Sequence, residues 1–150
     1  MNEFLGGGIT MIKQLSVFVE NEIGSLARVT SVLKDNSINL KAFASFDTPE
    51  FAILRIVVDQ PEKAKELLSV NGFAVKMSEA VAVELEDKPG DLDRLLHVIA
   101  DSELCVNYIY SFVLRNGRAP LMVINTDNLI KTVQILKENG FLVAEQEDMK

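Results

Sequence analysis

The chain has 150 residues, 48% of them hydrophobic and 25% charged, a composition typical of a folded globular protein. Its net charge of −7, without any cluster of lysine and arginine, argues against nucleic acids and anionic membranes as partners. No apolar run reaches the roughly 20 residues of a membrane span. The single cysteine, Cys105, excludes an internal disulfide and fits a cytoplasmic protein.

The chain begins with a segment that we expect to lie outside the fold. Residues 1–11 include three consecutive glycines, Gly6 to Gly8, and lack the basic region and apolar stretch of a signal peptide. We therefore interpret residues 1–11 as a flexible leader.

Residues 12–78 predict a first set of strands and helices. Leu15, Val17 and Val19 alternate with other residues, which predicts a strand. A helix then begins at Gly24 or Ser25, with Ser25 as a suitable N-cap. The elements that follow are a strand at 38–46, a strand at 51–59, a helix at 61–70 and a short strand at 73–78.

The same order recurs in residues 79–147. A shift of 66 residues places Gly24 on Gly90 and Ser25 on Asp91, and NGFAV at 71–75 matches NGFLV at 139–143 after two extra residues in a turn. Strands are expected at 104–112, 121–125 and 141–145, and helices from Asp91 and at 128–138. The duplicated order β-α-β-β-α-β predicts an α+β fold of two ferredoxin-like units, each an antiparallel sheet with its helices on one face. Their boundary is expected at residues 78–80.

The sequence offers few candidates for catalysis or metal binding. Metal-carrying versions of this fold need two thiols near the first loop, and this chain has one cysteine. The single histidine, His97, is expected on a polar helix face, so a Cys105–His97 pair is a minor alternative. We therefore expect no catalytic residues, no metal and no cofactor, and we do not expect an enzyme. An enzyme with unrecognised chemistry remains a third alternative.

Three short stretches resemble one family. DKPGDL at 87–92, INL at 38–40 and VENEIGSLARV at 19–29 are similar to the first loop and second strand of ACT domains, small regulatory modules that bind amino acids. The resemblance covers residues 12 to about 147 and extends to proteins made of two such units. It implies that strand 38–46 pairs with strand 104–112 to give one continuous sheet, with a small amino acid bound at the interface of the two units.

The expected ligand site lies at the two glycine loops. A loop glycine lets the backbone approach a ligand, and the helix N-terminus behind it favours a carboxylate. The resemblance and this argument together give the candidate residues Asn21, Ile23, Gly24, Ser25, Leu26, Asn39, Lys88, Pro89, Gly90, Asp91, Leu92, Asn107 and Tyr108. Asp91 places its own carboxylate at the second helix start, so the second site is expected to be weaker or empty.

Simpler interpretations stay open for several of these residues. The two glycines serve the tight turns alone in one alternative, and Asn39 caps an edge strand in another. Tyr108 shares a strand face with Tyr110, which is typical of packing.

The sequence thus predicts a non-catalytic regulatory protein that binds a small amino acid. The alternative is a regulatory or interaction subunit of an enzyme of amino-acid metabolism, with no ligand of its own. We also expect a homodimer, because Phe18, Phe43, Ile53 and Val57 are predicted to form an exposed apolar sheet face that a second copy would cover.

Overall fold

The computed structural model describes residues 11–113 and 118–150. Residues 1–10 of the predicted leader lie outside this described part. The chain divides into two compact units. The N-terminal unit comprises Lys13–Ser78 with the last two residues of the chain, and the C-terminal unit comprises Glu79–Asp148 with residues 11 and 12.

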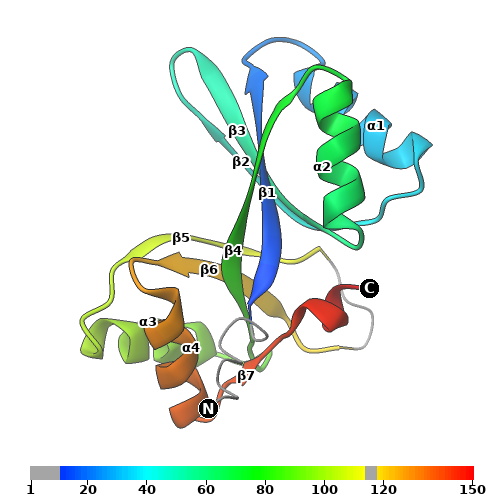
Figure 1. Ribbon diagram of the computed structural model, residues 1–150. Helices are drawn as coiled ribbons and strands as arrows, with labels where there is room; N and C mark the ends of the chain where they lie inside the picture. The colour runs from blue at the N-terminus through cyan, green and yellow to red at the C-terminus, as the bar shows by residue number, and fades with distance from the viewer. Residues whose placement is uncertain (1–10, 114–117) are drawn as a thin grey trace. The chain divides into compact units, whose positions relative to one another are not determined.

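The N-terminal unit has one sheet whose strands follow the order β2-β3-β1-β4, with β3 antiparallel to β1 and to β2. Helices α1 and α2 lie together on one face of it (Figure 1). Its core is formed by apolar side chains of both layers, such as Leu15, Val29, Ile56 and Leu68. Its elements are β1 (Ile12–Glu20), α1 (Ser25–Asp35), β2 (Leu40–Asp47), β3 (Phe51–Val58), α2 (Pro61–Val70) and the first part of β4 (Ala74–Glu84).

The C-terminal unit repeats this arrangement with the strand order β5-β6-β4-β7. Helices α3 and α4 pack against each other (Figure 1). Met11, which the sequence analysis counted with the leader, is buried in this core together with Val83 and Leu136. The elements after β4 are α3 (Asp91–Asp101), β5 (Val106–Ser111), β6 (Leu121–Thr126), α4 (Leu129–Glu138), β7 (Leu142–Val143) and a short 3₁₀ helix (Gln146–Met149).

The predicted α+β fold with two βαββαβ units is confirmed. The division between the units falls inside β4, an unbroken strand of 11 residues that ends the first unit and begins the second. Residues 74–84 contain no glycine, proline or asparagine that would favour a turn there. None of the helices in the described residues is long and apolar enough to cross a membrane.

The predicted pairing of the two second strands is wrong. β2 is hydrogen-bonded to β3, β5 is hydrogen-bonded to β6, and the described residues of β2 and β5 do not pair with each other. The expectation rested on the family resemblance, and it did not take account of the continuous β4. The two strands therefore stand at the ends of the order of hydrogen-bonded strands.

The predicted apolar sheet face is wrong at two of its four positions. Val57 is fully buried. Phe43 lies on the helix side of the sheet with Leu40, because the pairing register shifts between Leu40 and Ala42. An extra residue in one strand reverses the alternation of side chains beyond it. The periodicity alone could not show this reversal.

Candidate functional site

The first glycine loop connects β1 to α1. Gly24 has φ 84°, in the left-handed region that favours glycine, and the helix begins at Ser25. The backbone N–H of Ser25 donates to Glu22 O at 3.2 Å, and no side chain caps the helix start. The first turn also carries no acidic residue. The N-terminus of α1 therefore keeps the partial positive charge that attracts an anion.

Ser25 is the first helical residue and not the predicted N-cap. Its side chain is buried, with 3% of the residue exposed, and its hydroxyl has no hydrogen-bond partner. A buried hydroxyl without a partner costs about 1–3 kcal/mol. Such a cost is more typical of a position where a ligand or partner supplies the missing hydrogen bond than of a packing position.

The second glycine loop has the same backbone and different side-chain chemistry. Gly90 has φ 92°, and Asp91 opens α3 with 3% of its surface exposed. Asp91 Oδ2 accepts a hydrogen bond from the Glu86 backbone N–H at 2.6 Å, and Oδ1 accepts one from Arg94 Nε at 3.1 Å. The bond from Glu86, together with Arg94, holds the pKa of the Asp91 carboxyl below its usual value. This loop is therefore closed by a carboxylate of its own.

The arginines one turn into the two helices are held differently. Arg94 lies with its guanidinium carbon 3.9 Å from the ring centre of Phe141, and it donates to Asn139 O at 3.3 Å. Arg28, at the equivalent position, lies 5.9 Å from the ring centre of Phe73. Its nearest acidic partner is the exposed Glu22, at 3.7 Å. These arginines were not among the residues expected at the site, although the shift of 66 residues aligns them.

The structure does not bring Asn39 to Gly24 within the N-terminal unit. β2 begins beside Val58, the last residue of β3, whereas β1 ends beside Phe51, the first. Asn39 precedes β2 and Gly24 follows β1, so they lie beyond opposite ends of β3. The backbone N–H of Asn39 donates to Asp59 Oδ1 at 3.0 Å.

Asn107 and Gly90 are separated in the same way in the C-terminal unit. β5 begins beside Thr126, the last residue of β6, and β4 ends beside Leu121, the first. The amide of Asn107 donates to Asn125 Oδ1 at 2.8 Å. Each unit on its own thus places the loop glycine and the strand asparagine at different ends of its sheet.

The remaining predicted residues fall into two groups. The Tyr108 ring stacks on Tyr110, with ring centres 6.2 Å apart, beside the strand asparagines. Lys88 is ion-paired with Glu86. The members at the glycine loops and helix starts are all exposed: Asn21, Ile23, Leu26, Lys88, Pro89 and Leu92.

An apolar groove, which the sequence analysis missed, runs along α1 in the N-terminal unit. Its volume is about 230 Å³, and it extends from Leu26 to Leu33 on the helix. Leu40, Phe43, Leu54 and Ile56 line it from β2 and β3. Leu26, which follows Ser25 in the chain, is the first helix residue that lines the groove. Residue spacing could not reveal it, because the register shift in β2 places Phe43 on this side.

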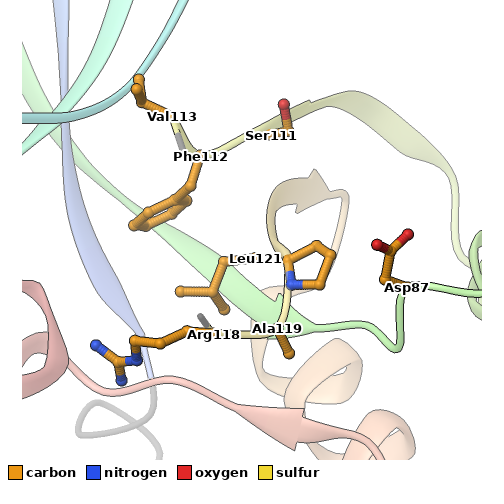
Figure 2. Close-up of a pocket in the computed structure, with 8 residues that line it drawn as sticks. Asp87, Ser111, Phe112, Val113, Arg118, Ala119 and Leu121 are labelled. Carbon is orange, nitrogen blue, oxygen red and sulfur yellow. The ribbon is translucent and has the colours of Figure 1, made fainter. Parts of the chain in front are cut away.

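A larger cavity of about 370 Å³ lies in the C-terminal unit. Figure 2 shows Phe112 and Leu121 around it, with the side chain of Arg118 directed away from Asp87, and Pro120 also lines the cavity.

The described residues give little support to other chemistry. They contain no group of three or more His, Cys, Asp and Glu side chains that could hold a metal. His97 Nε2 lies 3.6 Å from the exposed Asp93, and Cys105 is an exposed free thiol.

The comparisons with known proteins agree with this fold. A protein from Bacteroides thetaiotaomicron, BT0572, is 34% identical over 93% of this chain and 96% of its own, with a TM-score of 0.86. The regulatory subunit of aspartate kinase from Thermus thermophilus shares 13% identity, with 87% and 92% of the two chains covered and a TM-score of 0.60. The corresponding subunit from Thermus flavus shares 14% identity over 81% and 90%, with a TM-score of 0.54.

No curated protein sequence matches this chain. The family model described as an ACT domain pair matches residues 10–150, which is nearly the whole sequence. The chain therefore belongs to the family of ACT domain pairs.

Proposed function

We propose that this protein is a non-catalytic regulatory protein that binds a small amino acid at the start of α1 in the N-terminal unit. The observation that carries the proposal is the buried hydroxyl of Ser25, which has no partner at an uncapped helix N-terminus. An amino acid supplies a carboxylate that this position favours. Membership of the ACT family supports the regulatory role.

The groove along α1 supports an amino acid with an apolar side chain. Leu26, the next residue along the chain after Ser25, is one of its lining residues, and the lining is almost entirely hydrophobic. Ligand sites usually combine an apolar pocket with a few polar groups that fix orientation. A volume of about 230 Å³ is small for a ligand site, and it suits a free amino acid better than a larger metabolite.

A second copy of this chain would complete the site. β2 ends the order of strands, and pairing it antiparallel with β2 of another copy around Ala44 brings Lys41 opposite Asp47 of that copy. The same pairing carries Asn39 of the second copy toward the sheet end that bears Gly24. We therefore propose a homodimer with the ligand between the copies, located in the cytoplasm.

Charge reversal tests the homodimer. Lys41→Glu should place like charges opposite each other and lower the dimer fraction in sedimentation velocity. The double variant with Lys41→Glu and Asp47→Lys should restore the dimer. A wild-type protein that stays monomeric at micromolar concentration contradicts the proposed pairing.

A second candidate function is that of an interaction subunit without a ligand. Ile23 is fully exposed in the first loop, and Leu26 and Phe43, which line the groove together, are also exposed. Apolar side chains gathered in this way are typical of a protein contact. The names of the Thermus structures describe regulatory subunits of an enzyme, so in this alternative the partner is an enzyme.

A thermal-shift screen of the twenty amino acids separates the two candidates. A ligand at 100 times its dissociation constant adds about 2.7 kcal/mol to the free energy of unfolding. Ser25→Ala should stabilise the ligand-free protein by about 1 kcal/mol, since it removes a buried polar group without a partner, and should reduce the ligand shift. Ser69→Ala, an exposed helical serine, is the matched control. No shift with any amino acid would favour the interaction subunit.

A further inference from the structure

The two units treat the same position in opposite ways. In the C-terminal unit, the Asp91 carboxylate accepts hydrogen bonds from Glu86 N–H and Arg94, and Arg94 rests on Phe141. These contacts join the second glycine loop, α3 and the segment between α4 and β7 into one closed set. The carboxylate that completes this set belongs to the chain itself.

The N-terminal unit has the same set without the carboxylate. Glu20, Arg28 and Phe73 stand at the positions equivalent to Glu86, Arg94 and Phe141. Ser25 replaces Asp91, and its hydroxyl oxygen ends the side chain where aspartate has its carboxyl carbon. The hydroxyl has no partner. One carboxylate group is therefore the chemical difference between the two sets.

We propose that the carboxylate of the ligand binds the N-terminal unit where the Asp91 carboxylate binds the C-terminal unit, between the Ser25 hydroxyl, the Arg28 guanidinium and the backbone at Glu20. The Asp91 carboxylate then fills this position in the C-terminal unit, so that unit binds no ligand. Each chain therefore binds one ligand molecule. This inference rests on the proposed function and names the group of the ligand that is recognised, together with two residues, Glu20 and Arg28, that recognise it.

The weak ion pair of Arg28 with Glu22 explains how a ligand carboxylate could bind Arg28. Its pairing with Glu22 is long, at 3.7 Å, and both side chains are more than half exposed. Exposed ion pairs of this kind contribute little, so a carboxylate that binds Arg28 at closer range displaces Glu22 at small cost. Glu22 lies in the first glycine loop, so its release couples ligand binding to that loop.

In the C-terminal unit, a cavity lies beside this position. Asp91, Arg94 and Phe141 border a cavity of about 210 Å³. Replacing Asp91 with serine shortens the side chain beside this cavity and leaves Glu86 N–H and Arg94 without the carboxylate. Acetate carries the same carboxylate on a methyl group and is therefore a suitable probe of this position.

Four proteins test the proposal with sodium acetate as the probe and sodium chloride at equal ionic strength as the control. We expect acetate-induced amide shifts in NMR spectra at the N-terminal site of the wild type and at both sites of Asp91→Ser. Ser25→Asp should show them at neither site, and the double variant at the C-terminal site alone. Acetate should raise the thermal stability of each protein that shows such shifts. The Glu86 amide is the reporter for the second site. Acetate shifts that are the same in all four proteins would overturn the proposal.

Ser25→Asp has a further expected result, because it places a carboxylate at this position in the N-terminal unit. It should raise the stability of the ligand-free protein and lower the affinity for any amino acid found in the screen by more than about tenfold. Arg28→Gln should lower that affinity without raising the stability. An amino acid that still binds Ser25→Asp with unchanged affinity would overturn the carboxylate position and leave the proposed function intact. If no amino acid binds the wild type while the acetate series follows expectation, the amino-acid ligand fails and the carboxylate position stands.

Discussion

The loops before α1 and α3 have the same backbone conformation and differ in the hydrogen bonds made by the first residue of the helix. Gly24 and Gly90 have nearly the same left-handed conformation, and an 11-residue helix follows each of them. Asp91 bonds to its own loop, whereas the Ser25 hydroxyl bonds to nothing. A duplicated unit can thus keep its geometry while one copy closes its site and the other leaves a polar group for a partner. The presence of a carboxylate on the first helix residue of one copy, and of a hydroxyl in the other, makes the difference.

We expect the largest loss of stability when equivalent residues of the two cores are shortened. Ile56 and Ile124 occupy equivalent strand positions, opposite Leu15 and Val81, and both are fully buried. Ile56→Ala and Ile124→Ala should each lower the free energy of unfolding by about 2–5 kcal/mol, measured by urea denaturation. Because β4 supplies a strand to both units, we expect a single transition in each variant. Two separate transitions, with each variant moving only one, would show that the units unfold independently.

The next effect compares the two glycines. A Cβ added at Gly24 or Gly90 meets no atom within 4 Å, so the cost of alanine there is conformational. Gly24→Ala and Gly90→Ala should each destabilise the protein by about 1–2 kcal/mol. Calorimetric titration should then separate them, since only Gly24→Ala disturbs the proposed ligand site. Equal losses of affinity in both variants would contradict a difference between the loops.

The smallest expected effect is the pH dependence of the Asp91 contribution. The native pKa of Asp91 is lowered, chiefly by the Glu86 N–H and then by Arg94. The unfolded chain therefore takes up the proton first, and the ionised carboxylate stabilises the fold above its unfolded pKa of about 3.9. This stabilisation is lost as the pH falls from there through the lowered native value.

Asp91→Asn isolates this contribution, because asparagine can still accept the bond from Glu86. The stability difference between wild type and Asp91→Asn should shrink from about pH 6 to about pH 3 in urea denaturation. Glu62, whose pKa is also lowered by a hydrogen bond from Lys13, is common to both proteins and cancels. A difference that stays constant over this range would mean that the charge of Asp91 contributes nothing.

Much of the fold could be predicted from residues close together in the chain. The repeat, the element order and the glycines at the helix starts depend on local spacing and turn chemistry. The prediction failed where a feature depended on distant residues. The side of the sheet taken by Phe43 follows from a register shift against β3. The partner of β2 follows from the continuity of β4, which leaves β2 and β5 at opposite ends of the strand order.

The same distinction between nearby and distant residues applies to the candidate site. The two glycine loops before two helices, with aspartate at one helix start and serine at the other, can be read from the residues alone. The contacts of the Asp91 carboxylate with Glu86 and Arg94, and the burial of the Ser25 hydroxyl without a partner, depend on how the folded chain packs. The physical reason is that residue identity fixes which groups are available, whereas packing fixes which of them meet and which lose contact with water.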